Sequence, residues 1–597
     1  MASHRFACFG SLLESWRRRS SARVWAVGAL VAFGPGLASA QLTAAIAANR
    51  TSGLAPLAVR FDATGSDCNG NGTASEWNGD LEECSYSWDF GDPTSPPYAY
   101  GAAARAGQAP SANRSSGFVA GHVFENPGTH TLTLTIRNPS GQTATRTQTV
   151  NVSSFAGTTY CVRASNSGDF AGCPSGATQI TQSNFNTALS TCGATSGSRR
   201  CLFRRGDSFT AGSTSNLGNG PGLIGAFGSG ARPRIAGSGV AIGGGSDWRL
   251  ADLDFDGTTV DGASHRLLYR SRIRNAGHGY IWWGTGFSNI YLVRSTIENV
   301  SDYGYYVLAQ NQLVLGSAII NSGSGGGHNV RTGNAGRSVF ASSDFGPAGA
   351  GHVFKAVGEG QNGATAQYTI WRDNVILKSN AGYPWAFTLA PQGPGADDFA
   401  GGMAKVLVEG NYFTRATAGT TVSVLALLVR DIKDLTIRNN VCDMTQRYQT
   451  CMNLTTGTSG YGPITNATVM NNTAAWASGA GPDESEVVFR ISGGLSNVRV
   501  ANNLFYHGVS WGPAAVSCGS CSLNSSNLKI STNPFVSTSF SSPWSMRLAS
   551  GSAPVGAGVA APAAFFDISG ALRTGSHDVG AWELATATPP PPPVLLP

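Results

Sequence analysis

The sequence predicts an all-β protein in which a long solenoid of parallel strands, a β-helix, follows a small β-sandwich. Three observations predict this fold class. Glycine is abundant, with 78 of 597 residues, while only 12% of the residues are charged, a composition that favours turns and strands over helices. Short segments that alternate apolar and polar residues recur along the chain. Past Tyr160 they recur at the spacing of one solenoid turn, the pattern of a repeat architecture.

The first 40 residues have the composition of an export signal. Arginines, among them Arg17 and Arg23, precede the apolar stretch 24–33, and Ala38-Ser39-Ala40 matches the pattern that signal peptidase cleaves. We therefore expect residues 1–40 to be a signal peptide and the protein to be secreted, or periplasmic. The stretch is short and broken by Gly and Pro, and no later one approaches the roughly 20 apolar residues of a spanning helix, so we expect no membrane span.

Net charge and cysteine content further narrow the class of protein. Without the five Arg and one Glu of residues 1–40, the formal net charge falls from +6 to +2, and no basic patch predicts nucleic-acid binding. Ten cysteines remain, and an even number in an exported chain indicates local disulfides. The neighbouring pairs are Cys68 and Cys84, Cys161 and Cys173, Cys192 and Cys201, Cys442 and Cys451, and Cys518 and Cys521. A zinc site on the last pair would need a second ligand pair, which the sequence does not offer nearby.

Residues 41–153 predict a separate small domain. Apolar and polar residues alternate in segments such as 57–61 and 130–136, as in half-buried antiparallel strands. The segments Tyr86-Ser-Trp-Asp-Phe-Gly-Asp92 and 121–134 resemble a PKD domain, an immunoglobulin-like β-sandwich. Trp88 and Phe90 would face the core, whereas Asp89 and Asp92 are expected to hold a turn rather than a calcium ion. The resemblance implies a spacer or a binding module.

Residues 154–584 carry the repeat. Its segments are expected to place two inward-facing apolar residues two apart, then a small or polar residue at a turn and another apolar residue: 267–273, 291–297, 313–319, 406–412, 435–441, 467–473 and 498–504. Asparagines recur at that turn with spacings of 37, 29, 32 and 31 residues: Asn374, Asn411, Asn440, Asn472 and Asn503. Asparagines at one corner of successive coils can stack into a hydrogen-bonded ladder while tolerating the left-handed backbone of the bend. The leucine spacing of a leucine-rich repeat is absent, and no crossover helix is visible between the strands.

The repeat resembles the pectate-lyase-like superfamily of right-handed parallel β-helices. Two further segments carry the resemblance, Leu202-Phe-Arg-Arg-Gly-Asp-Ser-Phe209 and Gly575-Ser-His-Asp-Val-Gly-Ala-Trp-Glu583, so that it covers about residues 160–583. It implies contact with polysaccharide, but the superfamily holds lyases, hydrolases, epimerases, esterases and non-enzymatic proteins. The open ends of a β-helix need covers. We expect the PKD-like domain and the stretch 161–201 at one end and the tail after Cys521 at the other, with residues 585–597 forming a Pro-rich disordered tail.

A candidate site follows from aligning the second strand of successive coils. Segments 280–283, 305–308, 328–331, 352–355 and 385–388 place Arg331 beside Lys355 and His328 beside His352 in the column of Tyr280 and Tyr305. Because neighbouring coils lie about 4.8 Å apart, the two cations would stand side by side on the outer surface. The aromatic side chains expected to grip sugar faces are Trp282, Trp283, Tyr305 and Tyr306. Such a surface would suit a chain of uronic acids.

The resemblance implies chemistry for these residues. A β-eliminating lyase must neutralise the uronate carboxylate and remove the neighbouring C–H proton. We expect Lys355 to be the base, since the adjacent charge of Arg331 would weaken its hold on a proton, and Arg331 or Arg372 to bind the carboxylate. His328 and His352 are secondary candidates for proton transfer. Glu359, Asp373 and Asp344 are candidate ligands of a calcium ion (Ca2+).

Other interpretations remain open at this point. Arg331 and Lys355 could be an ordinary surface pair, and the histidines could only stack at a strand corner. A glycoside hydrolase would need gathered carboxylates, and Asp397-Asp398 with Gly277-His278-Gly279 resemble the polygalacturonase pattern in reverse order. A non-catalytic carbohydrate-binding protein is the third class. The leading hypothesis is a secreted, monomeric polysaccharide lyase that cleaves an acidic polysaccharide.

Overall fold

The structure is a computed structural model in which residues 41–597 form one compact unit. The residues that it describes are 41–101, 110–164, 168–284, 286–333, 335–357, 366–378, 386–390, 403–415, 424–444, 450–455, 463–476, 488–508, 514–540 and 542–584. Within these ranges, no helix is both long and apolar enough to cross a membrane. The signal peptide predicted at residues 1–40 and the tail 585–597 lie outside them.

The front domain is a two-sheet sandwich, as the alternating pattern predicts. One sheet has the order β1-β3-β6 and the other the order β2-β8-β7-β4-β5. The strands are β1 (Ala47–Ala48), β2 (Ser52–Leu54), β3 (Leu57–Asp62), β4 (Ser85–Asp89), β5 (Arg114–Ser116), β6 (Val119–Phe124), β7 (Gly128–Arg137) and β8 (Thr143–Ser153). Trp88 and Phe90 are buried in its core, as expected. Asp89 holds its turn by accepting the backbone N–H of Gly91 at 3.0 Å, and Asp92 accepts from the Thr94 hydroxyl at 2.9 Å.

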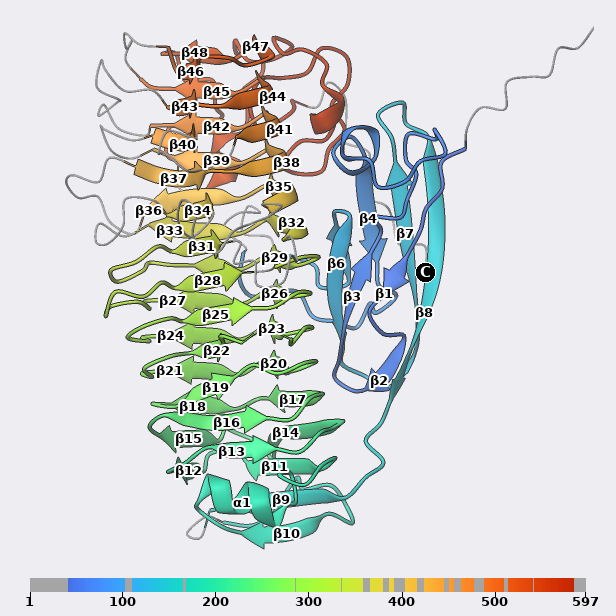
Figure 1. Cartoon of the computed structure of the whole chain (residues 1–597), viewed down its shortest axis with the longest axis vertical. Coiled ribbons are helices and arrows are strands. Elements are labelled where there is room, and N and C mark those ends of the chain that lie inside the picture. Colours follow the sequence, from blue (N-terminus) through green and yellow to red (C-terminus); the bar gives the residue numbers. More distant parts are fainter. Residues whose placement is uncertain are drawn as a thin grey trace, which may run out of the picture. The chain divides into compact units, whose positions relative to one another are not determined.

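The rest of the described chain is a β-helix of three parallel sheets, which confirms the predicted fold class (Figure 1). Each coil contributes one strand to each sheet in turn. The first sheet contains β9 (Thr159–Arg163), β10 (Thr178–Thr181), β11 (Arg200–Arg204), β14 (Gly222–Phe227), β17 (Trp248–Ala251), β20 (Leu267–Tyr269), β23 (Tyr291–Val293), β26 (Leu313–Leu315), β29 (Val339–Ala341), β32 (Gln367–Arg372), β35 (Met403–Glu409), β38 (Ile432–Arg438), β41 (Ile464–Met470), β44 (Leu495–Ala501) and β47 (Leu523–Ser525).

The second sheet follows the first around each coil. It contains β12 (Ser208–Ala211), β15 (Arg234–Gly237), β18 (Asp254–Asp256), β21 (Arg272–Arg274), β24 (Thr296–Glu298), β27 (Ala318–Ile320), β30 (Asp344–Phe345), β33 (Val375–Lys378), β36 (Tyr412–Arg415), β39 (Val441–Asp443), β42 (Thr473–Ala475), β45 (Leu504–Tyr506) and β48 (Leu528–Ile530).

The third sheet completes the coil. It contains β13 (Ser215–Leu217), β16 (Val240–Gly244), β19 (Thr259–Asp261), β22 (Tyr280–Trp282), β25 (Tyr305–Leu308), β28 (Val330–Gly333), β31 (Phe354–Val357), β34 (Phe387–Ala390), β37 (Val424–Val429), β40 (Thr450–Thr455), β43 (Phe489–Ser492) and β46 (Val516–Cys518). Side chains that point inward from all three sheets form one continuous apolar core along the solenoid.

The asparagine ladder is present at the turn between the first and second sheets. Each ladder amide donates to the side-chain oxygen of the next, as Asn411 Nδ2 does to Asn440 Oδ1 at 3.0 Å. The ladder continues to Asn527, and serines precede it on the earlier coils: Ser271, Ser295, Ser317 and Ser343. The left-handed backbone belongs to the residue before each ladder position, for example Asn439 with a φ of 56°. The sequence therefore predicted the ladder correctly. The residue with the left-handed backbone, however, is the one before each ladder asparagine and not the asparagine itself.

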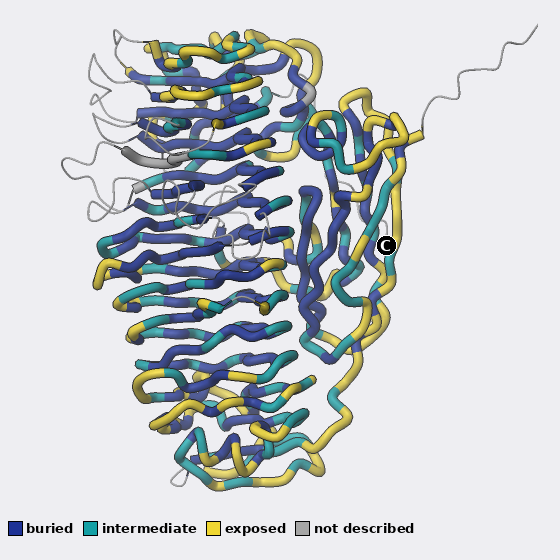
Figure 2. The backbone as a smooth tube through the Cα atoms, in the orientation of Figure 1, coloured by how far each residue is buried: buried dark blue, intermediate teal, exposed yellow. Residues whose placement is uncertain are grey.

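The predicted covers differ in position from the observed ones. The stretch 161–201 does close one end of the β-helix, because helix α1 (Phe185–Thr191) buries Phe185 and Leu189 in the solenoid core and is capped by Asn184. The PKD-like domain instead lies along the side, with β6 against β29 and β32 (Figure 1). The outward residues of the first sheet are large and apolar there, among them Tyr269 and Leu313, and only a lateral partner can bury them (Figure 2).

The tail after Cys521 also covers a side rather than an end. Its apolar residues, among them Phe535 and Trp582, pack on the outward side chains of the second sheet. A second column of asparagines, one residue before each ladder position and buried beneath the tail, anchors it. Asn471 Nδ2 donates to the carbonyl of Asp578 at 3.1 Å, and Asn439 Nδ2 to that of Phe566 at 2.8 Å. The segment 575–583 is thus a strap across the coils, and the turns of this tail include η3 (Pro543–Met546) and η4 (Pro562–Ala564).

Four of the five predicted cysteine pairs are disulfides, and the fifth is not. The bonded pairs are Cys68–Cys84, Cys161–Cys173, Cys442–Cys451 and Cys518–Cys521. Cys192 and Cys201 carry thiols that are buried beneath α1, with the two side chains hydrogen-bonded to each other. Burial raises the pKa of the Cys201 thiol, so it holds little of the reactive thiolate.

These two thiols provide a testable prediction. In the chain that begins at Gln41, we expect a thiol reagent to find no reactive cysteine in the folded protein and two after unfolding without a reductant. The measurement is a spectrophotometric thiol count before and after denaturation. A count of zero after unfolding would mean that Cys192 and Cys201 form the disulfide that their spacing predicted.

A buried carboxyl group beneath the tail provides a second prediction. Tyr412 and Thr414 both donate their hydroxyls to Asp443 Oδ2, at 3.2 and 3.1 Å, and burial raises the pKa of Asp443 to about 6. Because the folded protein holds this proton more tightly than the unfolded chain, its stabilising effect is complete below about pH 4. It is lost as the pH rises through about 6.

We therefore expect the Asp443→Asn variant to gain stability relative to the wild type between pH 4 and pH 8, by up to about 3 kcal/mol. Denaturant unfolding of both proteins at several pH values measures the difference. A difference that does not change with pH would mean that Asp443 titrates in the folded protein as it does in water.

Candidate active site

The predicted pair Arg331 and Lys355 lies on the outer face of the third sheet. Arg331 on β28 is the direct register partner of Lys355 on β31, and the same column continues to Tyr306 on one side and Thr388 on the other. Parallel strands in this register hold the two cationic side chains on adjacent coils. Arg331 is 9% exposed, and Lys355 is half-buried. The lateral arrangement on which the hypothesis depends is therefore present.

Aromatic side chains hold the Arg331 guanidinium in place. Its carbon lies 4.8 Å from the centroid of the Tyr306 ring and 6.0 Å from that of Tyr303. Trp283 extends the aromatic surface, with its ring centroid 5.9 Å from that of Tyr306 and half of its side chain exposed. A guanidinium above an aromatic face is favourably placed and loses some of its freedom to turn away.

A second column runs parallel to the first, three residues earlier in each coil. It consists of His278, Tyr303, His328 and His352, with successive ring centroids 6.5, 5.6 and 5.0 Å apart. The predicted alignment had placed Tyr280 and Tyr305 in the column of the histidines, and this register is wrong by two residues. His278 and Tyr303 were missed for that reason. The two columns, with Trp283 beside Tyr306, form a surface on the third sheet to which we refer as the groove: His278, Trp283, Tyr303, Tyr306, His328, Arg331, His352 and Lys355.

His328 is neutral in this groove. Burial, together with the nearby charges of Lys355 and Arg331, lowers its pKa to about 2. Its Nδ1 accepts the backbone N–H of His352 at 3.0 Å, so the ring proton of the neutral form lies on Nε2. With its lone pair occupied, His328 can donate a hydrogen bond but is poorly placed to remove a proton. His352 Nδ1 in turn lies 3.3 Å from the Thr388 hydroxyl.

Two of the predicted sugar-contacting residues face inward. Tyr305 is fully buried in the solenoid core, where its hydroxyl donates to Gln312 Oε1 at 2.9 Å. Trp282 stacks on Phe287, with the ring centroids 4.0 Å apart, against the same core. Neither prediction of surface contact is correct, because alternate residues of a strand point to opposite faces and these two occupy the inward positions. Trp283 and Tyr306 are the members of the predicted set that reach the groove.

Arg372 does not belong to this groove either. It lies on β32 of the first sheet, paired with Asp373 at 2.7 Å and donating to the Ser116 hydroxyl of the PKD-like domain. It therefore faces the interdomain contact, on a different sheet from Lys355. Its expected role as a carboxylate ligand beside Lys355 is wrong for this geometric reason.

The proposed calcium ligands do not form a site among the residues that the structure describes. Asp373 is engaged by Arg372, and Asp344 accepts the backbone N–H of Gly101 at 2.8 Å, with its pKa raised by burial. Glu359 and the Asp397-Asp398 pair lie outside the described residues. Within the described ranges, no three His, Cys, Asp or Glu side chains gather to hold a metal ion. Asp344 and Asp373, the two proposed ligands that the structure describes, are thus held by other partners and do not meet at one site.

Comparisons with known proteins match one domain and find several solved structures with low similarity to the chain. Residues 43–151 match the PKD domain family. None of the curated protein sequences matches the chain. Among solved structures, the chain is similar to the mannuronan C-5 epimerase AlgE4 A-module of Azotobacter vinelandii, at 12% identity, covering 56% of this chain and 94% of that one with a TM-score of 0.34.

The chain is also similar to two further solved structures. Pectate lyase Pel9A is 12% identical, with 71% of this chain and 96% of that chain covered and a TM-score of 0.33. The family 28 exopolygalacturonase of Yersinia enterocolitica is 10% identical, with 78% and 92% covered and a TM-score of 0.39. Similarities of this size say nothing of the reaction. The chain combines a PKD domain with a right-handed parallel β-helix.

Proposed function

We propose that this protein is a secreted, carbohydrate-active enzyme that cleaves an acidic, uronate-containing polysaccharide by β-elimination in the groove of the third sheet. The observation that carries the proposal is the register pairing of Arg331 with Lys355 beside an exposed aromatic surface. Trp283 and Tyr306 offer faces on which sugar rings can stack, and the two cations attract carboxylates. The four disulfides support an oxidising compartment outside the cytosol.

The proposed reaction assigns a separate task to each cation. Arg331, held over Tyr306, pairs with the uronate carboxylate and stabilises the negative charge that develops when the neighbouring C–H bond breaks. Lys355, as the neutral amine, takes that proton. The electron pair of the C–H bond forms the carbon–carbon double bond, and the glycosidic oxygen leaves with its electron pair and is protonated. His328 donates a hydrogen bond from Nε2 and orients the substrate.

The experiment that tests this proposal compares products across a panel of polymers. The protein is incubated with polygalacturonate, alginate and glycosaminoglycans, while ultraviolet absorbance of the unsaturated product and the number of reducing ends are followed. We expect both signals to rise together on at least one acidic polymer. Reducing ends without absorbance would replace elimination by hydrolysis, and an absence of both would leave a carbohydrate-binding protein.

The groove itself is tested by Arg331→Ala. Loss of a charge-assisted pair with the substrate carboxylate costs about 1.5–3 kcal/mol, so we expect kcat/KM on the cleaved polymer to fall by about 10- to 150-fold. Arg490→Ala is the matched control, because Arg490 lies on β43 of the same sheet, is exposed and is several coils away from the groove. If Arg331→Ala and Arg490→Ala were equally active, the reaction would not take place in the groove.

A further inference from the structure

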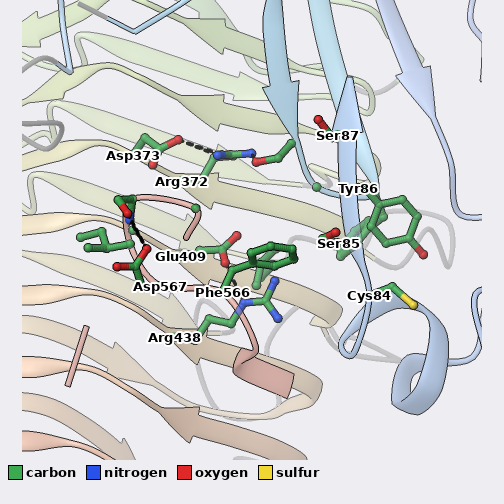
Figure 3. Close-up of a pocket in the computed structure, with 18 of the residues that line it drawn as sticks. Cys84, Ser85, Tyr86, Ser87, Arg372, Asp373, Glu409, Arg438, Phe566 and Asp567 are labelled. Atoms are coloured by element: carbon green, nitrogen blue, oxygen red, sulfur yellow. Dashed lines mark hydrogen bonds and ion pairs between the residues drawn. The ribbon is translucent and has the colours of Figure 1, made fainter. Parts of the chain in front are cut away.

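A cavity of about 250 Å³ lies where three parts of the chain meet, and we call it the junction cavity (Figure 3). The PKD domain contributes the outward side of β4, the first sheet contributes the ends of β32, β35 and β38, and the tail contributes residues 566–570. The groove of the proposed elimination lies on the third sheet, so the two sites have no lining residue in common.

The charged lining of the junction cavity consists of two Arg–carboxylate pairs and the carboxylate of Asp567, which accepts the backbone N–H groups of Ser569 and Ala571, both at 2.8 Å. Arg372 pairs with Asp373 at 2.7 Å, and Arg438 pairs with Glu409 at 2.8 Å. Each Arg is also anchored to another segment, Arg372 to the Ser116 hydroxyl and Arg438 to the carbonyl oxygen of Glu82 at 2.7 Å. The side chains of Arg372 and Arg438 are 8% and 10% exposed, so they are held rigidly.

Because both arginines are paired with carboxylates, the cavity favours a neutral ligand over an acidic one. Each of the two guanidinium groups already has a carboxylate within hydrogen-bond distance, so the lining offers no surplus positive charge to an acid. It still offers planar donors and acceptors at fixed positions, which can exchange hydrogen bonds with hydroxyl groups. The groove differs in this respect, because there two cationic side chains are neighbours in one column.

Hydroxyl and apolar groups complete the lining. Ser85 and Ser87 flank buried Tyr86 on β4, and both serines line the cavity (Figure 3). The half-buried ring of Phe566 and the side chain of Leu407 supply apolar surface. A sugar ring presents this combination of hydroxyl groups at its edge and C–H groups on its faces, and the C–H faces pack on aromatic rings.

We propose that the junction cavity is a second carbohydrate site, which binds a single neutral sugar residue. Its volume of about 250 Å³ lies just below the roughly 300–1,000 Å³ of ligand pockets, which suits one ring rather than a chain. The PKD domain would then act as one wall of a sugar site shared with the β-helix. This inference goes beyond the proposed elimination and does not depend on it.

The test uses ligand-observed saturation-transfer NMR on the full chain, with glucose, galactose, mannose, xylose and rhamnose as probes and glucuronate as the charged comparison. We expect transfer to at least one neutral sugar and a weaker effect for glucuronate. Ser87→Trp, which fills the cavity from an exposed position, should abolish the signal. Phe566→Ala should weaken Kd by up to about tenfold through loss of the stacked face.

A groove variant separates the two sites. Trp283→Ala removes an exposed side chain of the groove and should leave the neutral-sugar signal unchanged, while thermal melting checks that each variant is folded. The proposal is overturned if no neutral sugar gives transfer, if glucuronate binds more tightly than all of them, or if folded Ser87→Trp retains the signal. Loss of the signal in Trp283→Ala would also overturn it, by placing the sugar in the groove.

Discussion

Replacing Lys355 by Ala is expected to reduce the rate of β-elimination by about 10²–10⁴-fold, because a positioned general base contributes about this much to a proton abstraction. Lys355 is half-buried on the outer face of β31, and its removal leaves the inward neighbours Phe354 and Ala356 in place. The loss should therefore appear in kcat at an unchanged melting temperature. Initial rates of ultraviolet absorbance, measured on the polymer that the wild type cleaves, provide the number.

Lys433→Ala is the matched control for this variant. Lys433 is an exposed lysine on β38 of the first sheet, so its replacement removes the same charge from another face of the solenoid. We expect wild-type rates from it. If Lys355→Ala retained full activity, Lys355 would not be the base, even if elimination itself were demonstrated.

Replacing Asn440 by Ala is expected to lower the free energy of unfolding by about 3–5 kcal/mol. Asn440 is fully buried, and its amide donates at 3.0 Å to the carbonyls of Val408 and Arg438 and to Asn472 Oδ1, while its own Oδ1 accepts from Asn411. Alanine would leave several of these groups without partners inside the protein, and each such group costs about 1–3 kcal/mol. Denaturant unfolding measures the change.

The control for the ladder is Asn216→Ala. Asn216 is exposed on β13 of the same solenoid, and a surface substitution of this kind shifts stability by within about 0.5 kcal/mol. Similar losses in the two variants would mean that the ladder contributes no more to stability than any polar surface residue does.

The fold could be predicted from the sequence because its signals are local. The recurring asparagines marked one corner of successive coils, and each forms the expected bond with the next. Alternating residues around Trp88 marked the sandwich. These signals depend on the spacing of residues within one strand or one coil, and they hold whatever lies on the outside of the solenoid.

What lies on the outside could not be predicted in this way. Leu267 and Tyr269 were assigned to the interior pattern, yet both point outward against the PKD domain while Leu268 points inward. The alignment assumed that apolar residues face the core and that the outer surface meets water. Where another domain covers the outer surface, both faces of a strand are apolar, and a one-residue slip reverses every side chain.

The candidate site could be predicted only where the register of successive coils can be counted along the sequence. Arg331 and Lys355 belong to coils of nearly equal length, so their register could be counted along the sequence. Tyr305 and Trp282 were grouped with their neighbours Tyr306 and Trp283, although adjacent residues of a strand point to opposite faces and these two occupy inward positions. Arg372 was assigned to the groove although its coil brings it to a different sheet. No spacing rule could indicate that it would bind Ser116 of the PKD domain.

The most direct test of the central claim is a crystal structure of the Lys355→Ala variant with an acidic oligosaccharide of the polymer that the wild type cleaves. We expect one uronate carboxylate to pair with Arg331 and a neighbouring sugar ring to lie on Trp283 or Tyr306, with its C–H bond directed toward the position of the missing amine. An oligosaccharide bound elsewhere on the β-helix, with the Arg331 guanidinium still resting on Tyr306 and touching no carboxylate, would contradict the account.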